Sequence, residues 1–595
     1  MVRSIPKALR LGILIFSWGI GLAADLGQLR QHVYFLASSG LEGRRAGTVG
    51  AEVAASYVAR YFAGCNLQPM GNNATFMQTF SFIAEVQPGP GNSLRFQGAL
   101  ETSAPPDAFA PVSFSASGVV VGDLVFVGYG IAAPDIPYDD YQGVEVKDKV
   151  VLILRFSPAG DDPSSPFAPY MPLRRKVSDA VARGAKGVLI ATGPVSQASG
   201  EPVKVPFDAS FADAGVPVTA IATTLAEQLF AGQSFSLSEL QQRMNQRREP
   251  ASRPLPVTVH LSTDLRPQRK QTANVLALLP GTDPQLAEEF VVVGAHYDHL
   301  GFGGPGSNSL APDQRAVHNG ADDNASGVAA LLEIARQLAA SPGKRSLLFA
   351  AFGAEELGLL GSSFFVQHLP VPKEQVVAMV NLDMVGRPKK GPAVTAGGYG
   401  TAKEWPQLLE GCNRNHHLKL NPAMGGFGAS DHASFYAAGI PVLFFFTGAH
   451  EDYHRPTDDA EKLDYAGMAK VVQFAADVVR AVANLPQRPT FQKVAQEEGP
   501  RRSFRVRTGL VPEYGYEGAG VKVSGVRGGS AAEKAGLQAG DVVIQVGSRP
   551  VHNIYDYMYA LGDHKPGETV VFFVRRGEKT LELTVTFEVG GGGNR

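Results

Sequence analysis

The sequence predicts a multidomain α/β protein in which a three-layer α/β/α domain is accompanied by two smaller β-rich units. At 595 residues the chain is too long for one compact core, since a domain holds about 150 residues. Between 272 and 485, uniformly apolar strands alternate with amphipathic helices, which indicates a sheet buried on both faces. Short apolar runs between Gly, Pro and Asp turns indicate the two β-rich units, at 113–256 and beyond 503.

Charge and composition exclude several classes of protein. Lys and Arg number 54 against 56 Asp and Glu, a net charge of −2, so the chain offers no general basic field for nucleic acid. A hydrophobic fraction of 44% excludes an intrinsically disordered chain. Two cysteines, Cys65 and Cys412, exclude a disulfide framework, although a single bridge between them stays open.

The first residues indicate export. Basic residues precede the apolar run 11–22, and small residues follow it, as in a secretory signal peptide over 1–23. A retained membrane anchor is the alternative, but the run is shorter than the roughly 20 residues that span a bilayer. We therefore expect a secreted or periplasmic protein without stable membrane insertion after cleavage.

The predicted domain boundaries lie where the apolar periodicity and the polarity of the sequence change. Apolar residues three and four apart indicate helices near the start, and a polar stretch at 486–503 indicates a linker. The predicted order is a signal peptide (1–23), an N-terminal helical part of the main domain (24–112), a β-rich insert (113–260), the main α/β domain (261–488), a linker (489–502) and a C-terminal β-rich domain (503–589).

Within the main domain, each apolar strand ends at acidic or histidine residues. The strand endings and the helix start that follow them carry His296, Asp298, Asp323, Glu355, Glu356, Asp383 and His454. The carboxyl ends of strands form the ligand crevice of an open α/β sheet, so these side chains should converge. Singly, Asp323 could be a helix N-cap, Glu356 a helix start and His454 a surface residue, but their conjunction favours a site.

A group of two imidazoles and three carboxylates in one crevice requires a cation, because like carboxylates would otherwise force one of them to stay protonated. Zinc accepts this mixture of nitrogen and oxygen ligands. Five ligands serve two metal ions if one carboxylate bridges them, and such pairs activate a single hydroxide for hydrolysis.

Six motifs carry a resemblance to a known family. The chain resembles the co-catalytic zinc aminopeptidases, which include bacterial leucyl aminopeptidases and aminopeptidase Y, at GAHYDHLG (294–301), HNGADDNASGVA (318–329), AFGAEELGLLGS (351–362), NLDMVGR (381–387), ASDHASF (429–435) and YHRPTDD (453–459). The resemblance covers the α/β domain and, more weakly, the N-terminal helical region. It implies two Zn²⁺ per chain and an exported aminopeptidase that hydrolyses peptides with a free N-terminus.

The resemblance also implies the role of each metal ligand. His296 and Asp383 would hold one zinc ion, Glu356 and His454 would hold the other, and the Asp323 carboxylate would bridge the two ions. The resemblance also implies a cis peptide bond between Asp323 and Asn324. A hydroxide bridging the two ions would attack the scissile carbonyl.

Three further residues receive catalytic roles from the resemblance. Glu355 would be the general base, Asp298 would hydrogen-bond His296 and set its tautomer, and Tyr453 is a candidate donor to the developing oxyanion. His299 and His318 are interpreted as pocket or loop residues. The consecutive residues 430–432 cannot form a Ser-His-Asp relay and are interpreted as pocket wall.

The two β-rich units resemble accessory modules. The insert resembles a protease-associated domain, either restricting access to the cleft or serving only as packing. Residues from about 503 to 589 resemble a PDZ domain of the bacterial protease type, most clearly over 520–551. Its carboxylate-binding loop should lie at Thr508–Leu510. Because this stretch departs from the usual Gly-rich loop and Pro512 follows closely, peptide or protein binding and a purely structural role both stay open.

The same residues are also compatible with other functions. The alternatives are a carboxypeptidase or dipeptidase, a single-zinc cyclase on the same fold, and a non-catalytic scaffold built from the two accessory modules. No nucleic-acid partner is expected.

Overall fold

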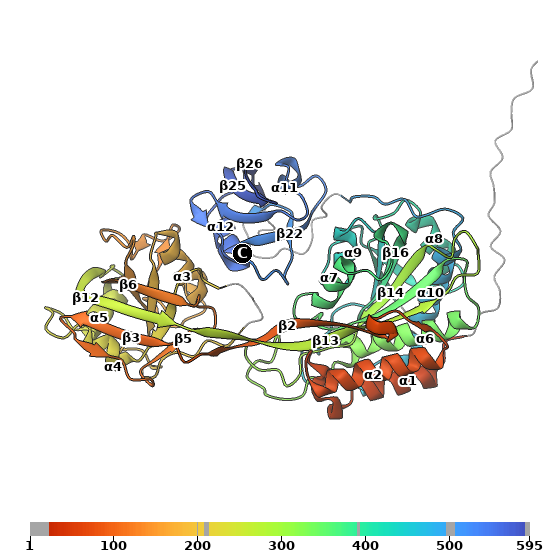
Figure 1. The fold of residues 1–595 in the computed structure, drawn as a ribbon, viewed down its shortest axis with the longest axis horizontal. Helices are drawn as coiled ribbons and strands as arrows, with labels where there is room; N and C mark the ends of the chain where they lie inside the picture. Colours follow the sequence, from red (N-terminus) through yellow and green to blue (C-terminus); the bar gives the residue numbers. More distant parts are fainter. Residues whose placement is uncertain (1–22, 199, 208–212, 389–392, 495–505, 590–595) are drawn as a thin grey trace, which may run out of the picture.

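The computed structural model describes residues 23–198, 200–207, 213–388, 393–494 and 506–589. The predicted signal peptide and most of the predicted linker lie outside these residues. Figure 1 shows three bodies: the large α/β domain, an inserted domain carried on a long two-stranded arm, and a C-terminal domain that lies between them.

The large domain is built on a nine-stranded sheet with the order β1-β13-β15-β14-β16-β19-β17-β18, to which β2 is added on β13. The strands are β1 (Gln68–Pro69), β2 (Met77–Pro88), β13 (Leu265–Leu279), β14 (Phe290–His296), β15 (Ser346–Phe352), β16 (Val376–Leu382), β17 (Ala393–Gly397), β18 (Lys419–Pro422) and β19 (Val442–Phe446). The central strands β15, β14, β16 and β19 are mutually parallel. Their carboxyl ends therefore meet at one edge.

Helices cover both faces of this sheet. They are α1 (Leu26–Leu36), α2 (Val49–Gly64), α6 (Gly327–Ala339), α7 (Leu360–Gln367), α8 (Trp405–Asn413), α9 (His432–Ala437) and α10 (Tyr465–Asn484). One apolar core lies under α1, α2, α6, α8 and α10, and a second lies under α7 and α9 on the other face. The predicted three-layer α/β/α domain is confirmed. Cys65 and Cys412, at the end of α2 and in α8, are free thiols.

The inserted domain has an eight-stranded sheet with the order β4-β3-β12-β6-β9-β10-β11-β5. Its strands are β3 (Ser93–Gly98), β4 (Thr102–Ser103), β5 (Phe109–Pro111), β6 (Gly118–Phe126), β9 (Val150–Leu154), β10 (Gly187–Ala191), β11 (Val218–Ile221) and β12 (Arg253–Thr263). The short pair β7 (Ala132–Ala133) and β8 (Tyr138–Asp139) and the helices α3 (Leu173–Ala182), α4 (Thr223–Gln228) and α5 (Leu237–Arg247) complete it.

Two sequence boundaries differ from the structure. The insert was predicted over 113–260, but β3, β4 and β5 lie in the inserted sheet ahead of residue 113, and β12 runs to Thr263. The reason is that β2 and β3 alternate buried and exposed side chains, a period of two that indicates strands. β2 and β13 pair from Leu265 with Pro88 to Val275 with Met77 and form the arm in Figure 1.

The C-terminal domain contains β20 (Val506–Arg507), β21 (Leu510–Pro512), β22 (Val521–Val526), β23 (Val542–Val546), β24 (Arg549–Pro550), β25 (Thr569–Arg576), β26 (Lys579–Thr586), β27 (Glu588–Val589), α11 (Ala531–Lys534) and α12 (Ile554–Gly562). Its main sheet has the order β21-β22-β23-β25-β26, so β21 is an edge strand. Across the described ranges, no helix has both the length and the apolar character of a membrane-spanning segment.

Candidate metal centre

The predicted metal ligands come from separate segments that meet at the carboxyl edge of the central sheet. His296 is the last residue of β14, Asp383 follows β16, and Glu356 follows β15 after a short turn. Asp323 lies just before α6, and His454 lies in the loop after β19. All five are at least largely buried, with the His454 side chain 12% exposed. The convergence expected from parallel strands is present.

Four of the five ligands form two groups that share the fifth. The Nε2 atom of His296 lies 3.4 Å from Asp323 Oδ1 and 3.5 Å from Asp383 Oδ1. The Nε2 atom of His454 lies 3.2 Å from Asp323 Oδ2 and 3.2 Å from Glu356 Oε2. The two oxygens of Asp323 therefore face different groups, which is the arrangement that a bridging carboxylate requires.

The chemistry of these donors fits bound cations. Asp383 Oδ1 is buried and has no hydrogen-bond partner among the described residues, and a buried carboxylate oxygen without a donor is costly. The ligand atoms of His296, Asp323 and Asp383 lie within 4.8 Å of one another, close enough to hold one ion. Two imidazoles with three carboxylates are a ligand set that zinc accepts.

The electrostatics of the cluster show the same demand for positive charge. Burial opposes protonation of His296, yet Glu355 and Asp383 raise the pKa of that imidazole well above its ordinary value. Burial likewise opposes protonation of His454, while Glu356 and Asp323 raise its pKa to about 11. Burial alone would raise the pKa of Asp323, but hydrogen bonds from the two histidines hold it well below its ordinary value.

Glu355 differs from its neighbour Glu356. Its Oε2 atom lies 3.8 Å from His296 Nε2, beside the cluster rather than between the two groups. Burial and the nearby carboxylates of Glu356 and Asp431 raise the pKa of Glu355 well above its ordinary value. The pKa of Glu356 is instead lowered to about 2, because its contacts with His454 and His299 outweigh burial and the charge of Asp323. Adjacent residues thus have opposite tendencies to hold a proton.

Asp298 makes contacts other than the expected one. Its Oδ1 atom is 3.8 Å from His296 Nδ1, beyond hydrogen-bond range, and that nitrogen lies 3.3 Å from the Asp298 backbone carbonyl. The Asp298 carboxylate accepts hydrogen bonds from the N–H groups of Glu355 at 3.0 Å and Glu356 at 3.4 Å. It therefore fixes the turn after β15 that carries both glutamates.

Tyr453 lies against the second group. Its ring is stacked on the His454 imidazole, with 3.9 Å between the ring centroids. Burial and then the charges of Asp323 and Glu356 raise the pKa of the Tyr453 hydroxyl, so the phenol keeps its proton over a wide pH range. A protonated phenol beside the ligands is a hydrogen-bond donor, as the predicted role requires.

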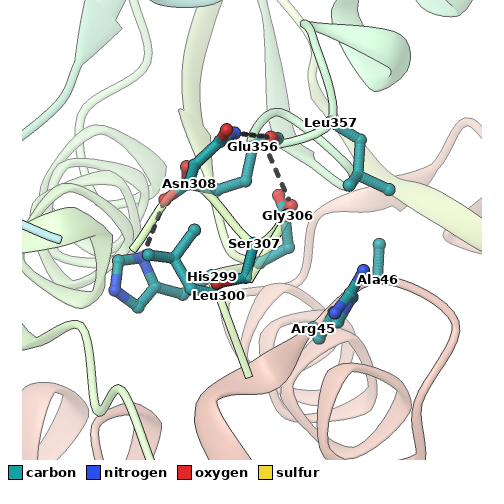
Figure 2. A pocket seen from close by; sticks show the side chains of 10 residues that line it. Arg45, Ala46, His299, Leu300, Gly306, Ser307, Asn308, Glu356 and Leu357 are labelled. Carbon is teal, nitrogen blue, oxygen red and sulfur yellow. Dashed lines mark hydrogen bonds and ion pairs between the residues drawn. The ribbon is translucent and has the colours of Figure 1, made fainter. Parts of the chain in front are cut away.

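Sequence reasoning missed residues that orient the second group. Figure 2 shows His299, Asn308 and Glu356 around one pocket. His299 Nδ1 is 2.8 Å from Glu356 Oε1, and the Asn308 side-chain amide donates to the Glu356 carbonyl at 3.0 Å. The Asn308 carbonyl lies 3.0 Å from His454 Nδ1, which leaves Nε2 of that imidazole facing the carboxylates. His299, interpreted as a pocket residue, does line the pocket.

Arg44 is a second missed residue, and it ties the N-terminal segment to the site. Its guanidinium donates to the Tyr297 carbonyl at 2.9 Å, the Asn319 carbonyl at 2.6 Å and the Gly320 carbonyl at 3.0 Å, and also to that of Leu36. The side chain is 1% exposed. No pattern in the sequence indicates which carbonyls Arg44 meets.

The Ser-Asp-His run contributes one direct contact. Ser430 Oγ donates to Asp383 Oδ2 at 2.7 Å and receives a hydrogen bond from the Asn381 amide at 2.7 Å. Asp431 and His432 are buried, and the His432 ring is stacked on Phe444 with 4.4 Å between centroids. The Ser430 contact orients Asp383, a predicted metal ligand, and the three residues form no nucleophilic relay.

Comparisons with known proteins match two segments of the chain. Residues 274–479 match the model of peptidase family M28, and residues 495–587 match that of the PDZ domain. These matches confirm the predicted peptidase family and the predicted PDZ domain. Identification of the insert as a protease-associated domain stays a prediction.

Relatives and solved structures match over different parts of the chain. Aminopeptidase YwaD of Bacillus subtilis is 33% identical over 224 residues, which are 36% of this chain and 43% of the relative. An aminopeptidase of Pseudomonas aeruginosa is 34% identical over 200 residues, 32% of this chain and 34% of the relative. The chain thus spans about half or less of the length of these two curated relatives. A solved aminopeptidase from Aneurinibacillus sp. strain AM-1 is 21% identical, with 81% of this chain and 98% of that chain covered, at a TM-score of 0.46.

Proposed function

We propose that this chain is an exported zinc aminopeptidase that removes N-terminal residues from peptides. The match of residues 274–479 to peptidase family M28 supports this proposal. The aminopeptidase names of its relatives support the activity. The observation that carries the proposal is that Asp323 turns one oxygen to His296 and the other to His454. That geometry favours two Zn²⁺ ions, with His296 and Asp383 on one side and Glu356 and His454 on the other.

Bound zinc supplies a Lewis acid that polarises a carbonyl oxygen and lowers the pKa of water. The chain supplies the proton transfer. Glu355 is buried beside the cluster, its pKa is raised, and it accepts a proton from the attacking water and returns it to the leaving amine nitrogen. The Tyr453 hydroxyl donates to the carbonyl oxygen as negative charge develops there.

Asp298 and Asn308 keep these groups in place. Asp298 holds the N–H groups of both glutamates, so Glu355 and Glu356 point in different directions from one fixed turn. Asn308 ties Glu356 to His454. The inserted domain, which we propose to be of the protease-associated type, is carried beside the catalytic domain on the β2–β13 arm.

The proposal is tested with leucine p-nitroanilide and its N-acetyl derivative. The free-amine substrate should be cleaved and the acetylated one should not, because an aminopeptidase requires the free α-amino group. Cleavage of C-terminal residues from an N-acetylated peptide would contradict the proposal.

Glu355→Gln should abolish turnover and leave zinc bound. The amide keeps the shape of the side chain but cannot accept the proton, so kcat should fall by about 10²–10⁴-fold. Zinc content, measured by metal analysis of the purified protein, should equal that of the parent. Asp383→Ala is the matched comparison, because it removes a ligand and should lower zinc content as well as activity. Retained activity in Glu355→Gln would remove this residue from the mechanism.

A further inference from the structure

The PDZ domain is held against both other domains. On the side of the insert, Arg549 of β24 pairs with Asp179 of α3 at 2.6 Å, and Arg175 of α3 pairs with Asp563 just after α12 at 2.6 Å. Asp179 and Arg175 are also paired with each other at 3.0 Å. Three of these four side chains are 11% exposed or less. A buried network of this kind fixes one orientation between the two domains.

On the other side, the segment that follows β21 lies on the active-site turn. A Cβ added at Gly358 would be 2.9 Å from the Cβ of Tyr514, and one added at Gly515 would be 2.8 Å from Leu360. The Gln367 amide of α7 donates to Glu513 at 3.4 Å. Gly358 is two residues from Glu356, so Tyr514, which follows β21, packs two positions along the chain from a proposed zinc ligand.

β21 has the features of a peptide-binding edge. It is the end strand of its sheet and pairs with β22 on one side. The loop before it contains Gly509, with φ of 79°, and its conformation is held by a contact of 2.6 Å between the hydroxyls of Thr508 and Tyr557 of α12. An extended peptide adds to such an edge and places its C-terminal carboxylate in a backbone loop.

Positive charge flanks this loop. Arg507 directly precedes it, and the backbone N–H of Arg527 donates to the Gly509 carbonyl at 2.9 Å. The Arg527 guanidinium itself lies over the Phe427 ring of the catalytic domain, 5.9 Å from the ring centroid. The positive charge of Arg507, just before β21, is complementary to a carboxylate. Pro512 offers no N–H to the edge, so the loop end carries most of the anchoring.

The direction of β21 leads from this loop to the metal centre. A peptide antiparallel to β21 has its C-terminus at Gly509 and its N-terminal part toward Tyr514, and Tyr514 lies against Gly358. Five strand residues from Gly509 to Tyr514 cover about 17 Å. Two further residues, from Gly358 to Glu356, cover at most about 8 Å. An extended peptide of about eight residues spans the sum of these two distances.

We propose that the PDZ domain binds the C-terminal carboxylate of the same peptide whose N-terminus lies at the metal centre. This inference rests on the proposed aminopeptidase function and names its substrate class: peptides of about eight or more residues with a free C-terminus. The enzyme would then hold both ends of its substrate, and each removed residue would shorten the span until the C-terminus leaves the loop.

The test compares peptide acids with peptide amides of the same sequence in the full-length enzyme. For a ten-residue peptide, the acid should have a kcat/KM about tenfold above that of the amide, the effect of one hydrogen bond to a charged group. For a three-residue peptide, which cannot reach the loop, the ratio should be one. A ratio of one at both lengths overturns the inference.

Two variants at Gly509 separate charge from backbone strain. Gly509→Asp adds a carboxylate at the loop and should reduce the acid-to-amide ratio of the long peptide to one. Gly509→Asn has the same size and is equally tolerant of a positive φ, and it should keep the ratio above that of the Asp variant. Equal ratios in the two variants would overturn the carboxylate assignment. Absence of leucine p-nitroanilide cleavage by the parent would instead contradict the proposed function itself.

Discussion

At the scale of single residues, Asn308 contacts two candidate metal ligands, one through its side chain and one through its backbone. Its backbone carbonyl faces His454 Nδ1 and its side-chain amide donates to the Glu356 backbone carbonyl, both at 3.0 Å. Its φ of 63° lies in the left-handed region, which Asn adopts more readily than most residues.

Asn308→Gly should weaken zinc binding about fivefold to tenfold. Glycine keeps the backbone conformation and the carbonyl contact, and only the amide hydrogen bond of about 1 kcal/mol is lost. The measurement is zinc retention in a chelator titration. Asn73→Gly is the control, because Asn73 is exposed with a φ of 51° and lies in the turn before β2. Equal retention in both variants would contradict the role of the Asn308 amide.

The convergence of most candidate metal ligands was predictable from the sequence, because they end or closely follow apolar strands or precede a helix. His296 ends β14 and Asp383 directly follows β16, so the edge where they meet follows from the parallel order of the strands. Asn308 was not predictable, since the Gly-rich loop that carries it has no periodicity. The contacts of Asp298 were also missed. Residues two apart on a strand face the same way, so the sequence suggested His296 as its partner rather than the backbone N–H groups of Glu355 and Glu356.

At the scale of elements, the packing of α1 on α2 contains a buried histidine. His32 of α1 is 1% exposed, and its Nδ1 atom is 2.7 Å from the Tyr57 hydroxyl of α2. Burial lowers the pKa of His32 to about 4, although Glu333 of α6 opposes this shift. The folded protein therefore keeps this imidazole neutral at mildly acidic pH.

Acidification should loosen α1 before the rest of the domain. The unfolded chain takes up a proton on His32 below pH 6.5 and the folded chain does so only near pH 4, so the free energy of unfolding falls as the pH drops between these values. From pH 6.5 to pH 5 the loss is about 2 kcal/mol. Hydrogen exchange of the α1 amides at the two pH values measures it. In His32→Gln the same pH step should have a smaller effect, and an unchanged step would contradict the assignment.

The element scale also shows what sequence patterns miss. β2 and β3 alternate buried and exposed side chains, the period of a strand, but this local pattern did not show that β3 belongs to the inserted sheet. The partner of a long strand is set by residues far away: Met77 pairs with Val275, nearly two hundred positions later. Local periodicity predicts the type of an element and says nothing about such a pairing.

At the scale of the whole molecule, the PDZ domain joins the insert to the catalytic domain. Its network with α3 combines two arginines and two aspartates, and Arg549 also donates to Ser178 Oγ at 3.0 Å. None of these pairings could be derived from the sequence, because the residues belong to domains that fold on separate cores.

Arg549→Ala should release the insert from the PDZ domain. Removing one arginine leaves Asp179 and Asp563 with a single cation, and breaking a buried pair costs about 3–5 kcal/mol. Small-angle scattering should show a larger maximum dimension than in the parent. Arg95→Ala is the control, since the pair of Arg95 and Glu101 is 55% and 60% exposed and should contribute little. An unchanged scattering profile in Arg549→Ala would contradict the bracing role.

The two-stranded arm has a further consequence for how such a chain can arise and be altered. Gly89 donates to the Asp264 carbonyl at 2.7 Å where the arm meets the insert, so the polypeptide departs and comes back at neighbouring points. The insert is thereby a cassette: its excision, with the cut ends closed as a tight hairpin, leaves every strand of the remaining sheet in its original register. Loss or exchange of such a cassette leaves every candidate metal ligand in place, since none of them lies between Gly89 and Asp264.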